Sequence, residues 1–426
     1  MNALGEYQRR ALSWLRGVAA DPALLAVGLG HGVTDWFPNS LFIILPYLAI
    51  DLNLSYSQIG VLMGWNYFTN FFVNLPGGFV VDLVGKTGAL LGLAVALTGL
   101  PYAVLGFSSS YAMAIVCITF VGIGSNLWHP AALSFLARRY PERKGLAMAI
   151  HTMGGNLGST CAPMAMGLAL TVLLWRRVVL LNFLGGLLLG GLLWKLFARV
   201  EPGRGAGQRT VLSLGEYGRS LRNMARNTSV LMLCALGGLR AMTSIGLFTF
   251  LPLYLAHELK YSPALVGACM TLVQGAGIVA SPVSGVLSDR RGRRPILTAG
   301  LLVTSGLLVA LAVLKFRLLF VGTLAVLGFF LFSLQPVVLA WLMDMAPPNM
   351  SGTAVSALFG VQSLFAGFSP AICGVIADRF GLLYAFYFLA STVFLANGIV
   401  YLIPRSSPAK SADVAAAACA ATRAKG

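Results

Sequence analysis

The chain of 426 residues contains little charge. Asp, Glu, Lys and Arg together make up 10% of it, whereas 58% of the residues are hydrophobic and the mean hydropathy is +0.82. Soluble domains carry about 25% charged residues, and disordered chains are low in hydrophobic residues. The composition therefore excludes a soluble globular enzyme and a disordered protein, and it indicates one integral membrane protein.

Acidic residues are scarcer than basic ones. There are 13 Asp and Glu against 30 Lys and Arg, for a net charge of +17. In a soluble protein this excess would suggest nucleic-acid binding. In a membrane protein it reports topology, because Lys and Arg collect in cytoplasmic loops. We expect a lipid bilayer as the surroundings of this chain and no nucleic acid as its partner.

Several motifs are absent. The six Cys include no CxxC pair and no metal-type spacing, and five of them fall in apolar stretches, so we expect small core residues and no disulfide framework. The four His are scattered and give no zinc-ligand spacing, so we predict no metal site. No phosphate-binding GxxxxGK[ST] loop occurs, which argues against an ATP-driven cycle. Without a recognisable nucleophile arrangement, we expect no enzyme, no catalytic residue and no cofactor.

Long apolar stretches are what the chain has instead. Twelve are long enough for a membrane span of about 20 residues. They run near 23–50, 58–82, 88–107, 111–138, 145–173, 178–198, 229–257, 263–287, 295–314, 317–345, 352–376 and 382–404. We predict an all-α membrane fold of 12 transmembrane helices in two pseudo-symmetric six-helix bundles.

The predicted bundles are 23–198 and 229–404, joined by a polar linker at 199–228. An N-terminal segment, 1–22, precedes them and an Ala-rich tail, 405–426, follows. With both termini inside, 23 of the 30 Lys and Arg lie on the cytoplasmic side and 6 on the other. This bias predicts a bacterial inner-membrane protein whose termini and linker are cytoplasmic.

The two halves repeat each other. Gly60 recurs as Gly267 at an offset of 207, and Pro163 recurs as Pro370 at the same offset. A shared register across several spans is hard to obtain by chance. It predicts two six-helix halves in the same orientation, as in transporters built from parallel repeats.

A basic loop motif occurs in both halves. The clear copy, Gly285-Val-Leu-Ser-Asp289-Arg290-Arg-Gly292-Arg293, lies between spans 8 and 9, and a degraded copy lies between spans 2 and 3. Glycine allows the tight turn, and the Asp and the bases can latch helix ends in one conformation. The alternative is a loop that only fixes topology. The predicted latch residues are Gly78, Asp82, Lys86, Gly285, Asp289, Arg290, Arg293 and Asp344.

Two charges lie inside spans. Asp35 is near the middle of span 1, and Arg240 is near the middle of the equivalent span 7. Each costs roughly 2.5–3.5 kcal/mol at a helix centre on insertion scales, so such residues usually face the bundle interior and have a function. The alternative is a structural Asp35–Arg240 pair that holds the halves together.

His31 precedes Asp35 by four residues and therefore lies on the same helix face. A His beside a carboxylate can titrate near physiological pH. We predict proton coupling by Asp35, His31 and His129, although His31 can also simply bond its neighbour. His151, nearer the cytoplasmic end of span 5, is not selected.

Arg240 and further polar or aromatic residues inside spans are predicted to bind the substrate. Each of the amides can instead bridge helices. The other residues of this set are Asn66, Asn126, Trp128, Asn156, Gln274, Gln335 and Gln362.

The loop motif and the twelve-span layout resemble the major facilitator superfamily. Three segments resemble its bacterial fosmidomycin-resistance exporters: His31-x-x-x-Asp35, Gly124-Ser-x-x-Trp128-His129-Pro130 and Gly154-Gly155-Asn156-x-Gly158. This resemblance implies proton-coupled export of small compounds, anions among them. The exporters have Asn at Thr34, an acidic residue at Ala131 and Lys at Arg240, so the resemblance does not define the drug.

We therefore expect a monomeric secondary transporter that exports drugs or small organic anions in exchange for protons, by alternating access. The alternative is a symporter or facilitator that imports an organic anion. A non-transporting membrane receptor or scaffold would need a signalling domain, for which the linker and the tail are too short.

Overall fold

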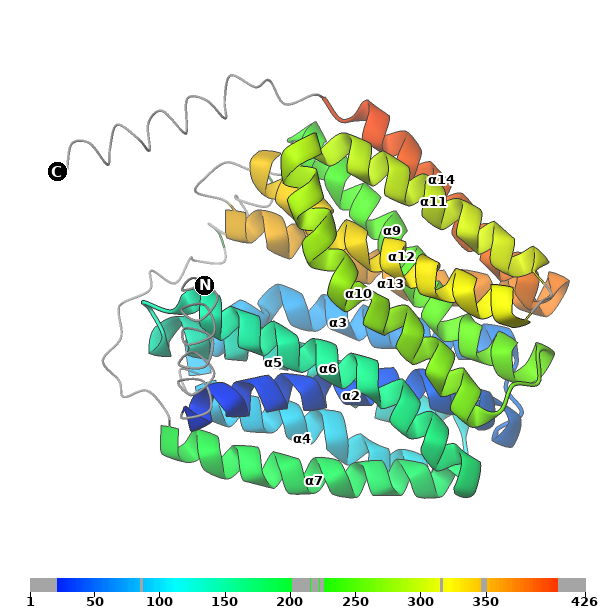
Figure 1. The fold of residues 1–426 in the computed structure, drawn as a ribbon. Helices are drawn as coiled ribbons and strands as arrows, with labels where there is room; N and C mark the ends of the chain where they lie inside the picture. The colour runs from blue at the N-terminus through cyan, green and yellow to red at the C-terminus, as the bar shows by residue number, and fades with distance from the viewer. Residues whose placement is uncertain are drawn as a thin grey trace, which may run out of the picture.

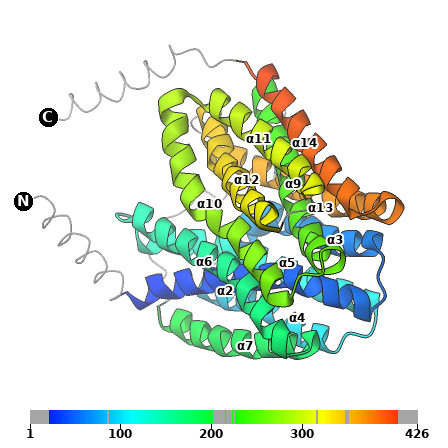
Figure 2. The same ribbon diagram turned by 45° about the vertical axis from the view of Figure 1, so that its right-hand side comes forward.

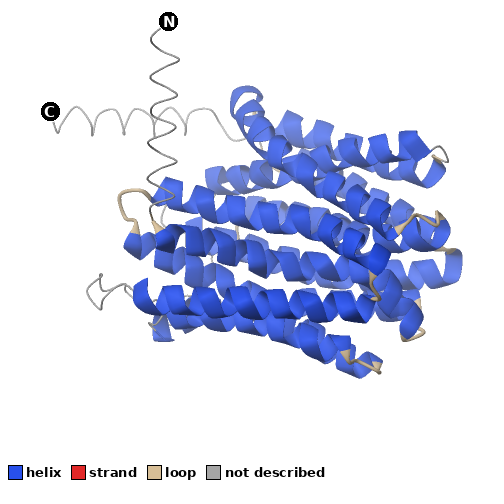
Figure 3. Ribbon diagram, turned by 60° about the horizontal axis from the view of Figure 1, so that its bottom comes forward, coloured by secondary structure: helices blue, strands red, loops and turns tan. Residues whose placement is uncertain are grey.

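The computed structural model describes residues 21–84, 87–200, 215, 222, 226–314, 317–345 and 351–404. Twelve long α-helices occupy these ranges in two groups of six (Figure 1), and no strand occurs in them (Figure 3). The first group is α2 (Pro22–Asp51), α3 (Tyr56–Val84), α4 (Thr87–Gly106), α5 (Tyr111–Arg139), α6 (Lys144–Val172) and α7 (Trp175–Val200). The second is α9 (Thr228–Leu253), extended by the π-helix η1 (Tyr254–Glu258), then α10 (Pro263–Arg291), α11 (Arg293–Val313), α12 (Arg317–Met345), α13 (Ser351–Phe380) and α14 (Leu382–Leu402).

The first helix of each half begins at a side-chain cap. The carboxylate of Asp21 accepts hydrogen bonds from the backbone N–H groups of Ala23 and Leu24, the second and third residues of α2, at 3.1 and 3.3 Å. The side-chain oxygen of Asn227 does the same for α9, also at 3.1 and 3.3 Å. Asp and Asn are preferred caps because their side-chain oxygens satisfy N–H groups that have no partner within the helix. The sequence thus marks both helix starts.

Ten of the twelve helices are long and apolar enough to count as membrane spans. The two others are α3 and α6. These two pack against the opposite half, α3 on α13 and α6 on α10 (Figure 1 and Figure 2). Helices at such an interface face little lipid, so they can carry amides and glycines in place of large apolar side chains. The predicted all-α membrane fold is confirmed.

The halves repeat each other in their packing as well. The contact of α2 with α6 corresponds to that of α9 with α13, and the contact of α4 with α7 to that of α11 with α14. The pair α3 and α5 likewise corresponds to α10 and α12. The predicted architecture of two pseudo-symmetric six-helix bundles is therefore present.

The repeated glycines and prolines lie where the halves touch. A Cβ at Gly60 on α3 would lie 2.1 Å from the carbonyl oxygen of Pro370 on α13, and one at Gly267 on α10 would lie 2.4 Å from that of Pro163 on α6. A side chain at either glycine would collide with backbone, so only glycine allows this approach. Gly60 and Gly267 lie in the first turns of their helices, so the halves close on each other at the end where α3 and α10 begin.

The described chain begins and ends on the opposite side. In Figure 1 the start of α2 lies at the lower left and the end of α14 at the top, both away from the right-hand end where α3 and α10 begin. The predicted linker 199–228 and tail 405–426 fall almost wholly outside the described residues, as does most of the segment 1–22. The division into these segments and the side on which the termini lie stay predictions.

Candidate functional site

A polar cluster in the second half surrounds Arg240, whose side chain is 9% exposed on α9. Its Nη2 donates to Oε1 of Gln335 on α12, and Nε2 of Gln362 on α13 donates to the same oxygen at 3.2 Å. Nη1 makes longer bonds, of 3.5 and 3.4 Å, to the Ser244 hydroxyl and the Leu331 carbonyl. The structure therefore brings three predicted substrate residues together.

The partners of Arg240 are all neutral. Its Nε is buried and has no hydrogen-bond partner among the described residues, and none of the ion pairs in that part of the chain includes Arg240. Asp35 has its ion-pair contact elsewhere, with Nε2 of His31 at 3.5 Å. The structural Asp35–Arg240 pair that the sequence allowed is thus not formed in this conformation.

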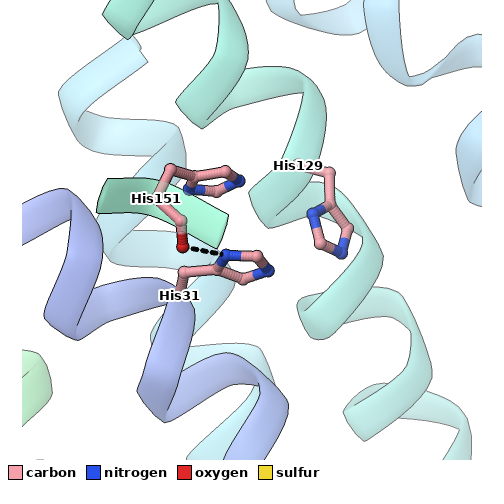
Figure 4. Close-up of side chains that lie close together, drawn as sticks. All are labelled: His31, His129 and His151. Carbon is pink, nitrogen blue, oxygen red and sulfur yellow. Dashed lines mark hydrogen bonds between the residues drawn. The ribbon is translucent and has the colours of Figure 1, made fainter. Parts of the chain in front are cut away.

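Three histidines meet in the first half. They come from three helices: His31 from α2, His129 from α5 and His151 from α6 (Figure 4). The ring of His31 stacks on that of His151 with centroids 3.9 Å apart and meets that of His129 edge-on at 5.0 Å. The sequence selected His31 and His129 but missed His151. The prediction of no metal site rested on the spacing of the four histidines along the chain. Spacing along the chain does not exclude a site whose ligands come from separate helices.

A line of asparagines joins α3 to α5. Asn66 donates to the Ile118 carbonyl at 3.0 Å, and Asn74 donates to the Asn126 side chain at 3.1 Å, while Asn126 itself donates to the Gly122 carbonyl at 3.0 Å. Asn66, Asn70 and Asn74 follow each other at intervals of four and so share one helix face. This spacing along one helix face could have identified Asn70 and Asn74 as further polar residues of α3, but neither was predicted. These bonds support a helix-bridging role for Asn66 and Asn126.

Among the described residues, three predicted substrate residues form no hydrogen bond to the Arg240 cluster or to the histidines. Trp128 is 0% exposed, and its ring fills the space beside Gly30, where a Cβ would lie 2.0 Å from it. It belongs to the packed core of the first half. Asn156 is exposed on α6. Gln274 is buried on α10, and its Nε2 has no partner among the described residues.

The clear copy of the loop motif forms an ion-pair network. Arg293 at the start of α11 binds Asp289 on α10 and also donates from Nε to Asp344 on α12 at 3.1 Å. Gly292 has φ +90°, a backbone conformation that favours glycine. The network joins three helices of one half, so in this conformation it ties helix ends within that half.

The remaining predicted latch residues are not part of the described ion-pair network around Arg293. Arg290 is exposed near the end of α10, and Gly285 has open space around its Cα. Gly78 and Asp82 lie on α3, but their side chains are outside the described part of the structure, and Lys86 is outside it altogether.

Asp378 was not predicted from the sequence. Its carboxylate, on α13, accepts hydrogen bonds at 2.8 Å from the backbone N–H groups of Tyr56 and Ser57 at the start of α3, and another from the Ser57 hydroxyl. The contact joins the two halves at their closed end. No sequence signal was available, because the partners lie 322 and 321 residues away.

An apolar cavity of about 650 Å³ lies between α2, α6 and α7. Gly28, Gly32 and Gly154 are among its lining residues, and Trp36 and Asn182 in its wall bond to each other at 2.7 Å. Neither Arg240 nor any of the three histidines lines it. It is therefore separate from the two polar clusters.

Known proteins share this organisation. The family model of the Major Facilitator Superfamily matches residues 25–254 and 231–423. The chain is 24% identical over 385 residues to the "Uncharacterized MFS-type transporter YfnC" of Bacillus subtilis (strain 168), covering 86% of this chain and 89% of that protein. It is 23% identical over 361 residues to the "Fosmidomycin resistance protein" of Escherichia coli (strain K12), covering 83% and 86%.

A solved structure has the same fold. It is a bacterial homolog of the human lysosomal transporter Spinster, in an inward-facing and unoccupied conformation. It superposes with a TM-score of 0.80 at 17% identity, over 91% of this chain and 98% of that one. At this identity the likeness shows the fold alone. The family match covers most of the chain, which therefore belongs to the Major Facilitator Superfamily and is a secondary transporter, not an enzyme.

Proposed function

We propose that this transporter exports small organic anions from the cytoplasm in exchange for protons, by alternating access. The observation that carries the proposal is Arg240, a buried cation in the second half whose partners in the described structure are all neutral.

A guanidinium stays protonated at any accessible pH. An unpaired buried charge costs several kcal/mol, which an anionic partner can offset. The planar guanidinium fork binds carboxylate or phosphonate groups through two parallel hydrogen bonds. An anion in this position would replace the Gln335 oxygen as acceptor, and the freed amides of Gln335 and Gln362 would be donors beside it.

Alternating access is supported by the contacts between the halves. The Gly60–Pro370 and Gly267–Pro163 approaches close the end where α3 and α10 begin. If the termini are cytoplasmic, as the sequence predicts, this end is the outer one and the conformation is inward-facing. The direction of transport rests on resemblance, since one relative is named for resistance to fosmidomycin. Asp35, His31 and His129 stay the predicted coupling residues.

Binding of anions by the purified protein tests the site. We expect calorimetry to detect binding of fosmidomycin or of another member of a panel of carboxylates and phosphonates. Removing one partner of a buried charged contact costs 2–5 kcal/mol or more, so Arg240→Ala should weaken binding by about 30-fold or more. The affinity of Arg240→Lys for the anion should be intermediate, because lysine keeps the positive charge but lacks the planar pair of N–H donors. Arg177→Ala, which removes an exposed arginine, is the matched control.

Normal binding by Arg240→Ala would make Arg240 a structural residue and the transported compound neutral or cationic. Failure of the parent protein to bind any member of the panel would also end the proposal.

Flux in proteoliposomes tests the coupling. With an imposed pH gradient, we expect the anion to accumulate in the compartment from which protons leave, and an ionophore that collapses the gradient should abolish this accumulation. Movement of anion and protons in the same direction would instead show a symporter.

A further inference from the structure

The histidine cluster of the first half has a geometry that the anion site does not explain. The cluster consists of His31, His129 and His151, and one ring nitrogen from each lies within 4.8 Å of the others. His31 and His151 are 8% and 5% exposed, and His129 is half-buried. Figure 4 shows the three rings, one from each helix, turned toward the same space.

The orientation of the His31 ring leaves Nε2 with a lone pair available for binding. Its Nδ1 lies 2.7 Å from the backbone carbonyl oxygen of His151, as the dashed line in Figure 4 marks. A carbonyl oxygen only accepts, so Nδ1 carries hydrogen and Nε2 of the neutral ring holds a lone pair. Histidines that ligate metals usually donate their second ring nitrogen in this way, to a carbonyl or a carboxylate.

The lone pair of His31 faces a negative group. Nε2 lies 3.5 Å from Oδ2 of Asp35, one turn further along α2. Two acceptors that face each other need a proton or a metal cation between or beside them. Nδ1 of His151 is also buried and has no hydrogen-bond partner among the described residues. Neither Nε2 of His31 nor Nδ1 of His151 therefore receives a hydrogen bond from the described residues.

We propose that His31, His129 and His151 bind a divalent transition metal ion of the Zn²⁺ class, next to the carboxylate of Asp35. Neutral imidazole is a ligand for Zn²⁺, Co²⁺, Ni²⁺ and Cu²⁺, whereas Mg²⁺ prefers oxygen. The Asp35 side chain is 30% exposed and His129 is half-buried, so an ion can reach the rings from this side.

Binding requires the rings to close on the ion. Zn–N bonds of about 2.0–2.1 Å place tetrahedral ligand nitrogens about 3.3 Å apart, against up to 4.8 Å here. Glycines hold α2 and α6 together, since a Cβ at Gly158 would lie 2.0 Å from the Gly32 carbonyl oxygen. Gly155 leaves room for the His31 ring, because a Cβ there would lie 2.5 Å from it. Rotation of the side chains can then complete the site.

The site belongs to one half only. All three helices are in the first half, whereas Arg240 is in the second. The metal site does not depend on anion binding at Arg240, so either of these two sites can fail while the other stands. It shares His31 and His129 with the predicted proton coupling.

Titration of the purified protein with Zn²⁺ tests the site, after removal of any affinity tag and treatment with a chelator. We expect calorimetry to show one Zn²⁺ per chain and no comparable binding of Mg²⁺. Co²⁺ should give the visible absorption bands of tetrahedral coordination by nitrogen. His31→Gln and His151→Gln should each lower the affinity for Zn²⁺ by about tenfold or more.

His257→Gln is the matched control. His257 is the remaining histidine of the chain, on η1 and outside the cluster, so this variant should bind Zn²⁺ as the parent does.

Absence of stoichiometric Zn²⁺ binding by the parent protein would overturn the proposal and leave a shared proton as the reason for the His31–Asp35 contact. Unchanged binding by His31→Gln and His151→Gln, or loss of binding in His257→Gln, would also overturn it. If the variants do not fold, the Co²⁺ spectrum of the parent decides, because a spectrum without tetrahedral nitrogen coordination excludes the site.

Discussion

The two halves share their backbone packing and differ in the polar groups that they enclose. Gly60 and Gly267 make the same close approach to the carbonyls of Pro370 and Pro163. In contrast, Gln335 in the second half occupies the repeat position of His129 in the first. One half carries titratable groups and the other a permanent cation with amides. The close backbone contacts between the halves are thus repeated, whereas the buried polar side chains differ from one half to the other.

The largest expected effect comes from breaking the repeated contact. Gly60→Val and Gly267→Val should each oppose closure of the same end, because each adds atoms where backbone already lies. Overpacking costs 1–3 kcal/mol, which corresponds to a loss of transport rate of about fivefold to a hundredfold. Initial rates of flux in proteoliposomes measure this loss.

Gly398→Val is the control for these two variants, since nothing lies within 4 Å of a Cβ at Gly398. The comparison predicts similar losses for Gly60→Val and Gly267→Val. If only one of the two variants were impaired, the contacts would not be equivalent.

A smaller effect is expected where the halves differ at the closed end. Asp378→Asn keeps the shape of the side chain but removes the charge that binds the start of α3. Hydrogen bonds to charged groups contribute about 1.5–3 kcal/mol. Because Asp378 is exposed, its contribution should be smaller than this range. We therefore expect the fraction of molecules closed at this end to fall about threefold to tenfold. Distances between spin labels on residues 52–55 and at Gly381 report that population.

Thr171 stands at the repeat position of Asp378, and among the described residues its hydroxyl bonds within its own helix, to the Leu168 carbonyl. Thr171→Val should leave the label distances unchanged. An equal response to both substitutions would show that Asp378 has no special role in closure.

The smallest effect is expected at the loop motif. Asp289→Asn weakens the network around Arg293, but exposed ion pairs contribute only about 0–1 kcal/mol. We expect transport to slow by about twofold to fivefold, with the same amount of protein in the membrane. Asp82→Asn, in the copy with fewer bases, should slow transport less. Unchanged flux in Asp289→Asn would reduce the motif to a topology signal.

Hydropathy and register along the chain were sufficient to predict the spans and the repeat. A membrane span is a local property, because about 20 apolar residues in a row are stable in a bilayer whatever their neighbours. The charges at Asp35 and Arg240 stood out for the same reason, since either is costly inside such a span. Gly60 and Pro370 were recognisable as repeat positions, but their mutual contact was not.

The contacts between helices were decided by the tertiary structure. His151 was passed over because its position beside His31 depends on α6 lying against α2, and Asp378 because its partners are more than 300 residues away. Trp128, a predicted substrate residue, is fully buried in the core, where Gly30 on another helix leaves room for its ring. Which face of a span meets which neighbour depends on close packing between segments far apart in the chain, and the hydropathy of a single segment contains no information about that.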